Sequence, residues 1–256
     1  MSNPKVIHFE PHGPGDTGLA EWDTIDPGDL EAGNPVQRGH IYHQDEALGY
    51  MAGVWDCTAM TGKFEPYAVH EFMFLLEGSV IMVLEDGSEI TVNAGEPFVI
   101  PKGLPCQWKQ PGYIRKYFMI FENPGARAAD DVASQGVILP RPSGPPGGIE
   151  EAEIGNPSDF IGDLPMQHKH TSFRDPSGQM TVGMWGSTPF ETELHPYSCH
   201  EFVRLLEGAV TITEEDGATH SFEAGDAFYT PKGSVCAWKT TGYVKKLYAI
   251  LDPAAG

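Results

Sequence analysis

The sequence predicts an all-β protein built from two copies of one strand domain. The chain repeats itself, because residues 55–121 align without a gap with residues 185–251 and 28 of the 67 aligned positions are identical. In both copies, short runs of β-branched and aromatic residues alternate with Gly, Pro or Asp-Gly turns, a pattern typical of sandwiches and barrels. No stretch holds a convincing helical period. A repeat of this size is a whole domain rather than one unit of a solenoid.

The 256 residues are expected to divide into four segments. An irregular N-terminal arm spans residues 1–36, an N-terminal barrel residues 37–122, a linker residues 123–153 and a C-terminal barrel residues 154–256. The linker is recognised by its cluster PRPSGPPGG, since Pro and Gly interrupt regular structure. Within the linker, Gly125–Ser134 is the best candidate for one short helix.

The strands of each copy follow in order. Residues 79–95 contain two β-prone runs joined across Asp86-Gly87, which is a strong hairpin signal. The second copy repeats this hairpin across Asp216-Gly217. After each hairpin comes a strand that begins at a Gly turn and ends at Pro-Lys-Gly, and then a strand rich in β-branched and aromatic residues.

Charge and composition exclude several classes of function. The formal net charge of −20 would repel the phosphate backbone of a nucleic acid and an anionic membrane surface. No apolar run is long enough to span a bilayer, and the N-terminus lacks the apolar stretch of a signal peptide. We therefore expect a cytoplasmic protein. Its four cysteines are too few for a disulfide scaffold and should be free thiols.

Certain motifs in both copies resemble those of the cupin superfamily. Glu71 and Gly78 match the end of the first cupin motif, and residues 95–103 (GEPFVIPKG) match the second. The other copy repeats them at 201–208 and 225–233. The sequence segments EF…LLEG, PKGxxCxWK and GYxxK are similar to those of the ureidoglycine aminohydrolase-type branch of cupins. The resemblance implies a bicupin, that is, two double-stranded β-helix (jelly-roll) barrels with a small-molecule pocket in each. Duplicated cupins often pair their two barrels back to back, and a homodimer is one assembly open to such a protein.

The C-terminal copy keeps part of the cupin metal site. The first motif usually reads His-x-His-x3-Glu, and here its positions hold His195, Tyr197 and Glu201. The later histidine of the second motif is replaced by Cys236. Imidazole, carboxylate and thiolate would leave a water position open on a divalent transition metal such as Zn, Mn or Fe. Tyr197 would then stand beside these ligands, either as the catalytic proton donor or as a weak fourth ligand.

Alternating side chains place further residues around this pocket. Cys199 should share the inward face with Glu201, and Trp238 should form part of the wall. His200 has the opposite parity, so we expect it on the outer face or at an interface, as for His70 in the first copy. The His168 and His170 pair should lie at the pocket edge or surface. The alternative to a metal is an interior that holds a satisfied His, a buried Cys and a Tyr.

The N-terminal copy has lost more of the motif, and no metal is expected there. Two carboxylates in its interior could hold a hard cation, act as an acid–base pair or bind a cationic molecule, or one could lie in solvent at the mouth. The residues expected around this pocket are Glu65, Tyr67, Glu71, Cys106 and Trp108.

Two functions from different classes follow. The first is a metal-assisted enzyme that acts on a small polar, nitrogen-bearing metabolite, and the resemblance implies hydrolysis at a C–N bond. The second is a non-catalytic bicupin that binds or senses a small molecule without a metal. A dioxygenase is the least supported reading, because it requires a histidine-rich iron site. The chain has no GxSxG elbow and no Gly-rich phosphate loop.

Overall fold

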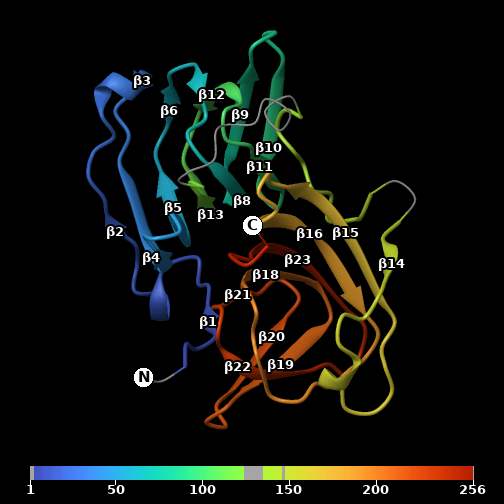
Figure 1. The fold of residues 1–256 in the computed structure, drawn as a ribbon. Helices are drawn as coiled ribbons and strands as arrows, with labels where there is room; N and C mark the ends of the chain where they lie inside the picture. Colours follow the sequence, from blue (N-terminus) through green and yellow to red (C-terminus); the bar gives the residue numbers. More distant parts are fainter. Residues whose placement is uncertain (1–2, 124–134, 146–147, 256) are drawn as a thin grey trace. The chain divides into compact units, whose positions relative to one another are not determined.

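A computed structural model describes residues 3–123, 135–145 and 148–255 of the chain (Figure 1). These residues form an all-β protein, which confirms the predicted fold class. The helical turns among them are three short 3-10 helices, η1 (Pro14–Asp16), η2 (Pro27–Asp29) and η3 (Pro157–Asp159). The predicted helix at Gly125–Ser134 lies outside the described residues. No helix within those described ranges is long and apolar enough to cross a membrane.

Contacts divide the chain into two compact units. The N-terminal unit comprises Phe9–Arg141 with Asp175–Ser177, and the C-terminal unit comprises Met1–His8, Pro142–Arg174 and Gly178–Gly256. Each unit contains two antiparallel sheets, as expected for a barrel flattened into a jelly roll.

In the N-terminal unit the first sheet has six strands. Their spatial order is β11 (Pro97–Ile100), β8 (His70–Glu77), β13 (Ile114–Phe121), β5 (Tyr50–Cys57), β4 (Gln37–Asp45) and β2 (Ala20–Glu21). The second sheet has the order β10 (Glu89–Asn93), β9 (Ser79–Leu84), β12 (Pro105–Gln110), β6 (Met60–Gly62) and β3 (Leu30–Gly33), with β7 (Glu65–Pro66) also paired to β12.

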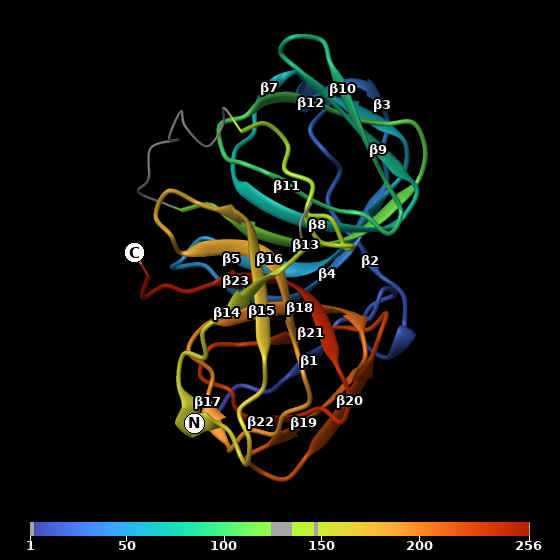
Figure 2. The same cartoon turned by 90° about the vertical axis from the view of Figure 1, so that its right-hand side faces the viewer.

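The C-terminal unit repeats this plan (Figure 2). Its larger sheet has the order β1 (Ile7–His8), β21 (Ala227–Thr230), β18 (His200–Glu207), β23 (Val244–Leu251), β16 (Met180–Ser187), β15 (Gln167–Arg174) and β14 (Glu150–Ala152). The smaller sheet has the order β17 (His195–Pro196), β22 (Val235–Lys239), β19 (Ala209–Glu214) and β20 (Thr219–Glu223).

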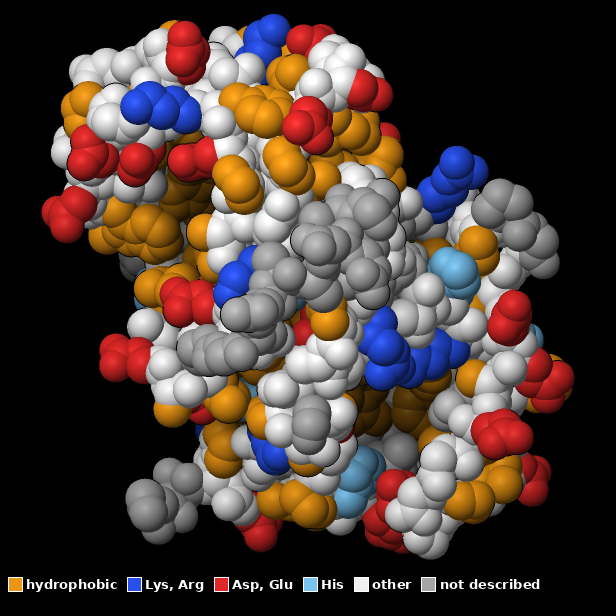
Figure 3. Space-filling model, turned by 45° about the horizontal axis from the view of Figure 1, so that its top comes forward, with side chains coloured by type: hydrophobic (Ala, Val, Ile, Leu, Met, Phe, Trp, Pro, Cys, Tyr) orange, Lys and Arg blue, Asp and Glu red, His pale blue; other side chains and the backbone are white. Residues whose placement is uncertain are grey.

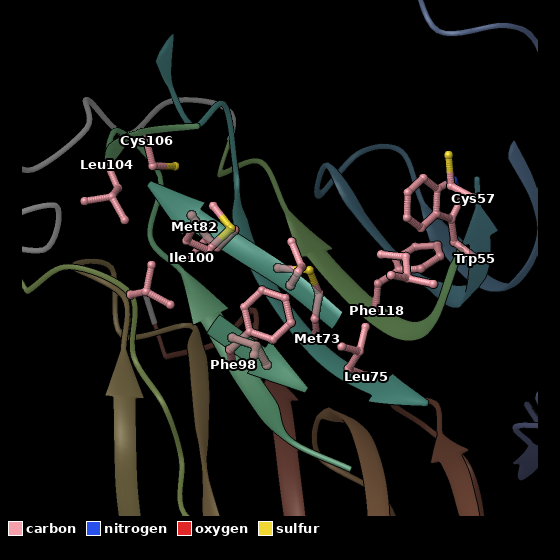
Figure 4. Packing of buried hydrophobic residues seen from close by; sticks show 14 residues of the cluster. Trp55, Cys57, Met73, Leu75, Met82, Phe98, Ile100, Leu104, Cys106 and Phe118 are labelled. Atoms are coloured by element: carbon pink, nitrogen blue, oxygen red, sulfur yellow. The ribbon is translucent and has the colours of Figure 1, made fainter. Parts of the chain in front are cut away.

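The core of each unit lies between its two sheets. In the C-terminal unit Val203 and Phe228 of the larger sheet belong to one buried cluster with Ile212 and Trp238 of the smaller sheet. The N-terminal unit has the matching cluster, and Figure 4 shows its side chains pointing into a common interior. The mouth of such a barrel is where a pocket is expected.

Both predicted hairpins are present. Strand β9 pairs with β10 and β19 with β20, and Gly87 takes the positive φ of 79° that the turn requires. At Gly208 the backbone itself is too close for a side chain, because a Cβ there would lie 2.1 Å from the Tyr243 carbonyl oxygen. The glycine that ends the repeated Leu-Leu-Glu-Gly is therefore needed for two reasons: it forms a turn, and it lets another backbone segment pass close by.

The N-terminal arm is more regular than the sequence indicates. Its first strand, β1, pairs with β21 and so extends the larger sheet of the C-terminal unit. Lys5 forms ion pairs with Glu214 at 2.8 Å and Asp216 at 2.6 Å, and the Val6 N–H donates to Glu214. The rest of the arm supplies edge strands to the N-terminal unit. A two-residue strand has no periodicity, so the sequence pattern could not predict this pairing.

The acidic composition is visible on the surface. Figure 3 shows Asp and Glu side chains spread over the displayed face, with fewer Lys and Arg side chains between them. The spread is consistent with the argument from net charge against a polyanionic partner.

Candidate functional site: a buried lysine in each barrel

A buried ion pair lies in the C-terminal barrel where the cupin motif leads one to expect a metal. The Lys246 ammonium lies 2.7 Å from Glu201 Oε1, and the two side chains are only 9% and 4% exposed. The Tyr197 hydroxyl donates to the other carboxylate oxygen, Oε2, at 2.7 Å. Both oxygens of Glu201 therefore already have a strong donor.

Strand pairing explains why these groups meet. Glu201 is the second residue of β18 and Lys246 lies on β23, and these two strands are neighbours in the larger sheet. Glu201 has the same parity along β18 as Val203, and Lys246 has the same parity along β23 as Val244. Val203 and Val244 belong to the buried core cluster, so all four side chains point inward.

Two indole rings flank the lysine. The Lys246 Nζ lies 5.1 Å from the ring centroid of Trp185 and 4.7 Å from that of Trp238, which is within the range of cation–π attraction. Desolvation of an ammonium is costly unless a counter-charge and polarisable faces replace the water. Glu201 and the two rings provide those replacements.

The N-terminal barrel contains the same arrangement. Lys116 lies 2.7 Å from Glu71 and 4.9 Å from the rings of both Trp55 and Trp108. The Tyr67 hydroxyl donates to Glu71. The duplication has thus preserved a Tyr–Glu–Lys triad between two tryptophans in both barrels.

The tyrosine of each triad stays protonated. Burial, with the neighbouring Glu201 carboxylate as a second cause, raises the pKa of Tyr197 well above its usual value of 10. The pKa of Tyr67 is raised for the same reasons, with Glu71 as its neighbour. Both phenols therefore act as hydrogen-bond donors near neutral pH and not as bases.

An aromatic cavity of about 250 Å³ opens beside the Lys246 triad. Its walls carry the aromatic residues Phe160, Trp185, Phe190, Tyr197 and Trp238. Polar groups reach it from Asn156, Asp159, Gln167, His195 and Lys246. A second cavity of about 380 Å³ is lined by Cys199, Glu201 and Lys246 among others. Aromatic walls with a few polar side chains are the usual composition of a small-molecule site.

The residues predicted as metal ligands lie near one another but have other roles. His195 is opposite Cys236 in the register of β17 and β22, and its Nδ1–H donates to the Glu193 carbonyl oxygen at 2.9 Å. Cys236 is fully buried, and burial raises the pKa of its thiol to about 11. Burial and the Glu201 charge raise that of Cys199 to about 12. Neither thiol is the thiolate that binds a metal or attacks as a nucleophile.

These donors do not fit a divalent metal well. Glu201 is held by an ammonium and a phenol, and the Cys236 sulfur would have to lose a strongly held proton. Within residues 3–123, 135–145 and 148–255, no three His, Cys, Asp or Glu side chains gather closely enough to hold a metal ion. The metal expected from the sequence stays a prediction.

In the N-terminal barrel the predicted pocket residues separate. Tyr67, Glu71 and Trp108 surround Lys116, whereas Glu65 is exposed and lies opposite the buried Cys106 in the register of β7 and β12. Burial raises the pKa of Cys106 to about 11. Trp108 Nε1–H donates to Gln110 Oε1 at 2.7 Å, so this ring is fixed by a second polar contact.

The histidines expected outside the pockets make contacts of their own. His70 Nδ1 accepts the Lys102 backbone N–H at 3.1 Å, and His200 Nδ1 accepts that of Lys232 at 3.2 Å. His200 also stacks on Tyr229. His168 and His170 lie half-buried on β15.

Sequence reasoning missed the lysines of the triads. Lys116 and Lys246 were visible as identical residues of the repeat, each in a strand otherwise rich in apolar and aromatic residues. Lysine is almost never buried without a partner, so a lysine at an inward-facing position of both copies was the available signal.

Comparison with known proteins places the chain in a family. The pattern of the EutQ-like cupin domain matches residues 48–118 and again residues 174–248. The chain belongs to the EutQ-like cupin family. It is a bicupin, since both halves match, as the repeat predicts. No curated protein matches the chain. The finer resemblance to the ureidoglycine aminohydrolase-type branch stays a prediction.

Solved structures support the same fold. A protein of unknown function of the DUF861 family from Pseudomonas syringae pv. tomato is 25% identical, with a TM-score of 0.77 over 96% of this chain and 99% of that one. Protein Ylba from E. coli is 10% identical, with a TM-score of 0.55 over 98% and 92%. A cupin 2 conserved barrel domain protein from Leptotrichia buccalis is also 10% identical, with a TM-score of 0.55 over 91% and 98%.

Proposed function

We propose that this bicupin binds a small polar, planar molecule in its C-terminal barrel without the help of a metal. The observation that carries the proposal is the position of Lys246. Its ammonium forms an ion pair with the Glu201 carboxylate at the edge of an aromatic-walled cavity. A cation fixed to the protein then fills the role of a bound metal ion as the positive centre of the site.

The cavity has the size and composition for such a ligand. Its volume of about 250 Å³ corresponds to roughly eight water molecules, which is room for a small metabolite. Trp185 and Trp238 contribute aromatic wall against which a planar group can pack, and Gln167 and Asn156 offer amide donors and acceptors. The Nδ1–H bond of His195 to a carbonyl leaves its Nε2 as an acceptor in the neutral ring.

Binding measurements on the full chain test the proposal. The protein is treated with EDTA and titrated with ureides, amino acids and small carboxylates such as hydantoate, glycine and glyoxylate, with tryptophan fluorescence and calorimetry as readouts. At least one probe should bind equally well before and after EDTA. Lys246→Met should weaken that binding at least about 10-fold, since the positive centre is lost.

Two controls make the result decisive. Lys116→Met removes the matching lysine of the N-terminal barrel and should leave the affinity unchanged. The double variant Lys246→Met/Glu201→Gln removes both charges and guards against misfolding from an unpaired carboxylate. A stoichiometric metal whose removal abolishes binding would overturn the proposal in favour of the metal-assisted enzyme. So would the absence of binding to every probe.

A further inference from the structure

Three buried polar atoms in the C-terminal barrel have no hydrogen-bond partner among the described residues. They are Thr230 Oγ1, Ser234 Oγ and Trp238 Nε1, in residues that are 0%, 1% and 6% exposed. A buried polar group without a partner is costly and uncommon in folded proteins. Three of them in one barrel therefore require an explanation.

The fold itself does not require the two hydroxyls, whereas the tryptophan is present in both barrels as Trp108 and Trp238. At the aligned positions the N-terminal barrel carries Ile100 and Leu104, which are buried in its core cluster. Figure 4 shows both side chains in the interior, in the region of Cys106. The same scaffold thus folds with larger, apolar groups, and the C-terminal barrel has exchanged them for smaller hydroxyl-bearing ones.

The three groups border the Glu201 triad. Thr230 is opposite Glu201 in the register of β21 and β18, and it has the same inward parity as Phe228 of the core cluster. The Ser234 carbonyl oxygen accepts the backbone N–H of Tyr197 at 2.8 Å. Trp238 stacks on the Tyr197 ring with a centroid distance of 6.1 Å and an interplanar angle of 14°.

The chemistry of the three groups selects an anionic oxygen. The indole N–H can only donate, and both hydroxyls can donate, so the three groups next to the triad can supply three donors. The Trp238 ring also acts on the Cys236 thiol, whose pKa it lowers against the larger effect of burial, but no atom completes a hydrogen bond of normal geometry to Nε1. The facing charges are those of Glu201 and Lys246, which compensate each other.

We infer that Thr230, Ser234 and Trp238 form the subsite for the carboxylate of a small carboxylic acid whose planar remainder occupies the aromatic cavity. The inference rests on the proposed function and names its ligand class. Because the three atoms have no contact with solvent, a neighbouring side chain has to move for the carboxylate to reach them. Tyr197 is the side chain that we expect to move, since it lines the cavity and stacks on Trp238.

The test removes the hydroxyls without changing the shape of the site. The double variant Thr230→Val/Ser234→Ala is compared with the wild type in titrations with hydantoate, glyoxylate and benzoate, and with benzamide as an uncharged match for benzoate. Wild type should bind at least one carboxylate and prefer benzoate to benzamide. The double variant should bind that carboxylate at least about 10-fold more weakly, because two charge-assisted hydrogen bonds are lost.

Thermal unfolding without a ligand gives an independent readout. Loss of two unpaired buried hydroxyls should raise the Tm of the double variant by about 4 °C or more. Thr240→Val is the matched control, because the buried Thr240 Oγ1 accepts the Phe190 N–H at 3.1 Å and its loss should lower the Tm.

The outcomes separate the two proposals. If the wild type binds none of the probes, the proposed function fails and the subsite falls with it. If the wild type binds a carboxylate and the double variant binds it equally well, the proposed function stands and the subsite is refuted. A double variant with an unchanged or lowered Tm shows that the hydroxyls are satisfied by something other than a ligand, such as ordered water, and also refutes the subsite.

Discussion

Replacement of Lys246 by Met should destabilise the C-terminal unit strongly. The substitution leaves Glu201, whose side chain is 4% exposed, as a buried carboxylate with the Tyr197 hydroxyl as its remaining donor. Loss of one partner of a buried ion pair costs about 3–5 kcal/mol. Loss of the cation–π contacts to Trp185 and Trp238 adds roughly 0.5–1 kcal/mol for each ring.

The expected change is large enough for a simple assay. For a chain of this size 1 kcal/mol corresponds to about 2–4 °C in Tm, so the variant should unfold roughly 10–20 °C below the wild type in calorimetry at pH 7.5. The second variant, Lys246→Met/Glu201→Gln, carries neither charge. It should recover at least about half of the loss, because replacement of a whole buried pair by neutral groups is often close to neutral.

Lys245→Met serves as the matched control. Lys245 is the preceding residue and also forms an ion pair, but its N–O distance to Glu207 is 3.5 Å and the Glu207 side chain is 57% exposed. Such a pair contributes at most about 1 kcal/mol. The reasoning is refuted if Lys246→Met lowers the Tm no more than Lys245→Met does, or if the double variant is less stable than either single one.

Three further predictions concern the titrating groups. Burial raises the pKa of Cys236 to about 11 from 9.0 and that of Tyr248 to about 12 from 10.0, so the folded chain holds these protons more tightly than the unfolded chain. The resulting stability is complete below about pH 9 and is lost as the pH rises through 11 and 12. The Tm should therefore be flat from about pH 7.5 to 8.5 and fall between pH 9 and 11, and a Tm constant to pH 11 would contradict this. Cys199, with its pKa of about 12, should react with iodoacetamide at pH 7.5 at least about 100-fold more slowly than a free cysteine, as followed by mass spectrometry, and a rate equal to that of free cysteine would show an accessible thiolate. Asp56→Asn in the N-terminal unit should lower the free energy of unfolding by about 2–4 kcal/mol in denaturant titrations, because this 1% exposed carboxylate accepts hydrogen bonds from Arg38 and Tyr113 at 2.9 Å. The control Glu77→Gln, at a half-exposed carboxylate, should lower it by less than about 1 kcal/mol.

The fold was predictable because the sequence signals for its turns and strands are local and occur in both copies of the repeat. The Asp-Gly hairpins, the Gly turns and the β-prone runs each specify nearby backbone, and the repeat removes the ambiguity of a single occurrence. The pairing of β1 with β21 was not predictable in the same way. It joins residues more than two hundred positions apart, and although β21 is predicted from its flanking turns, the two residues of β1 carry no pattern that marks them as its partner.

The site was only partly predictable. The cupin motif correctly directed attention to Tyr197 and Glu201, which do meet. It also led to a search for metal ligands, and so it gave no role to Lys246, although this lysine ends the GYxxK segment of both copies. The unpaired hydroxyls of Thr230 and Ser234 are invisible in a sequence, since an inward-facing Ser or Thr is usually satisfied and only coordinates reveal that these are not.

The position of β1 has a consequence for how this chain can be made and divided. Strand β1 forms the border of a sheet, and its partner β21 is synthesised more than two hundred residues after it. Until then the growing polypeptide has to keep that segment available. A shortened version that starts at Pro142 would lack it and leave one side of β21 with open amides and carbonyls, a ready template for unwanted association between molecules.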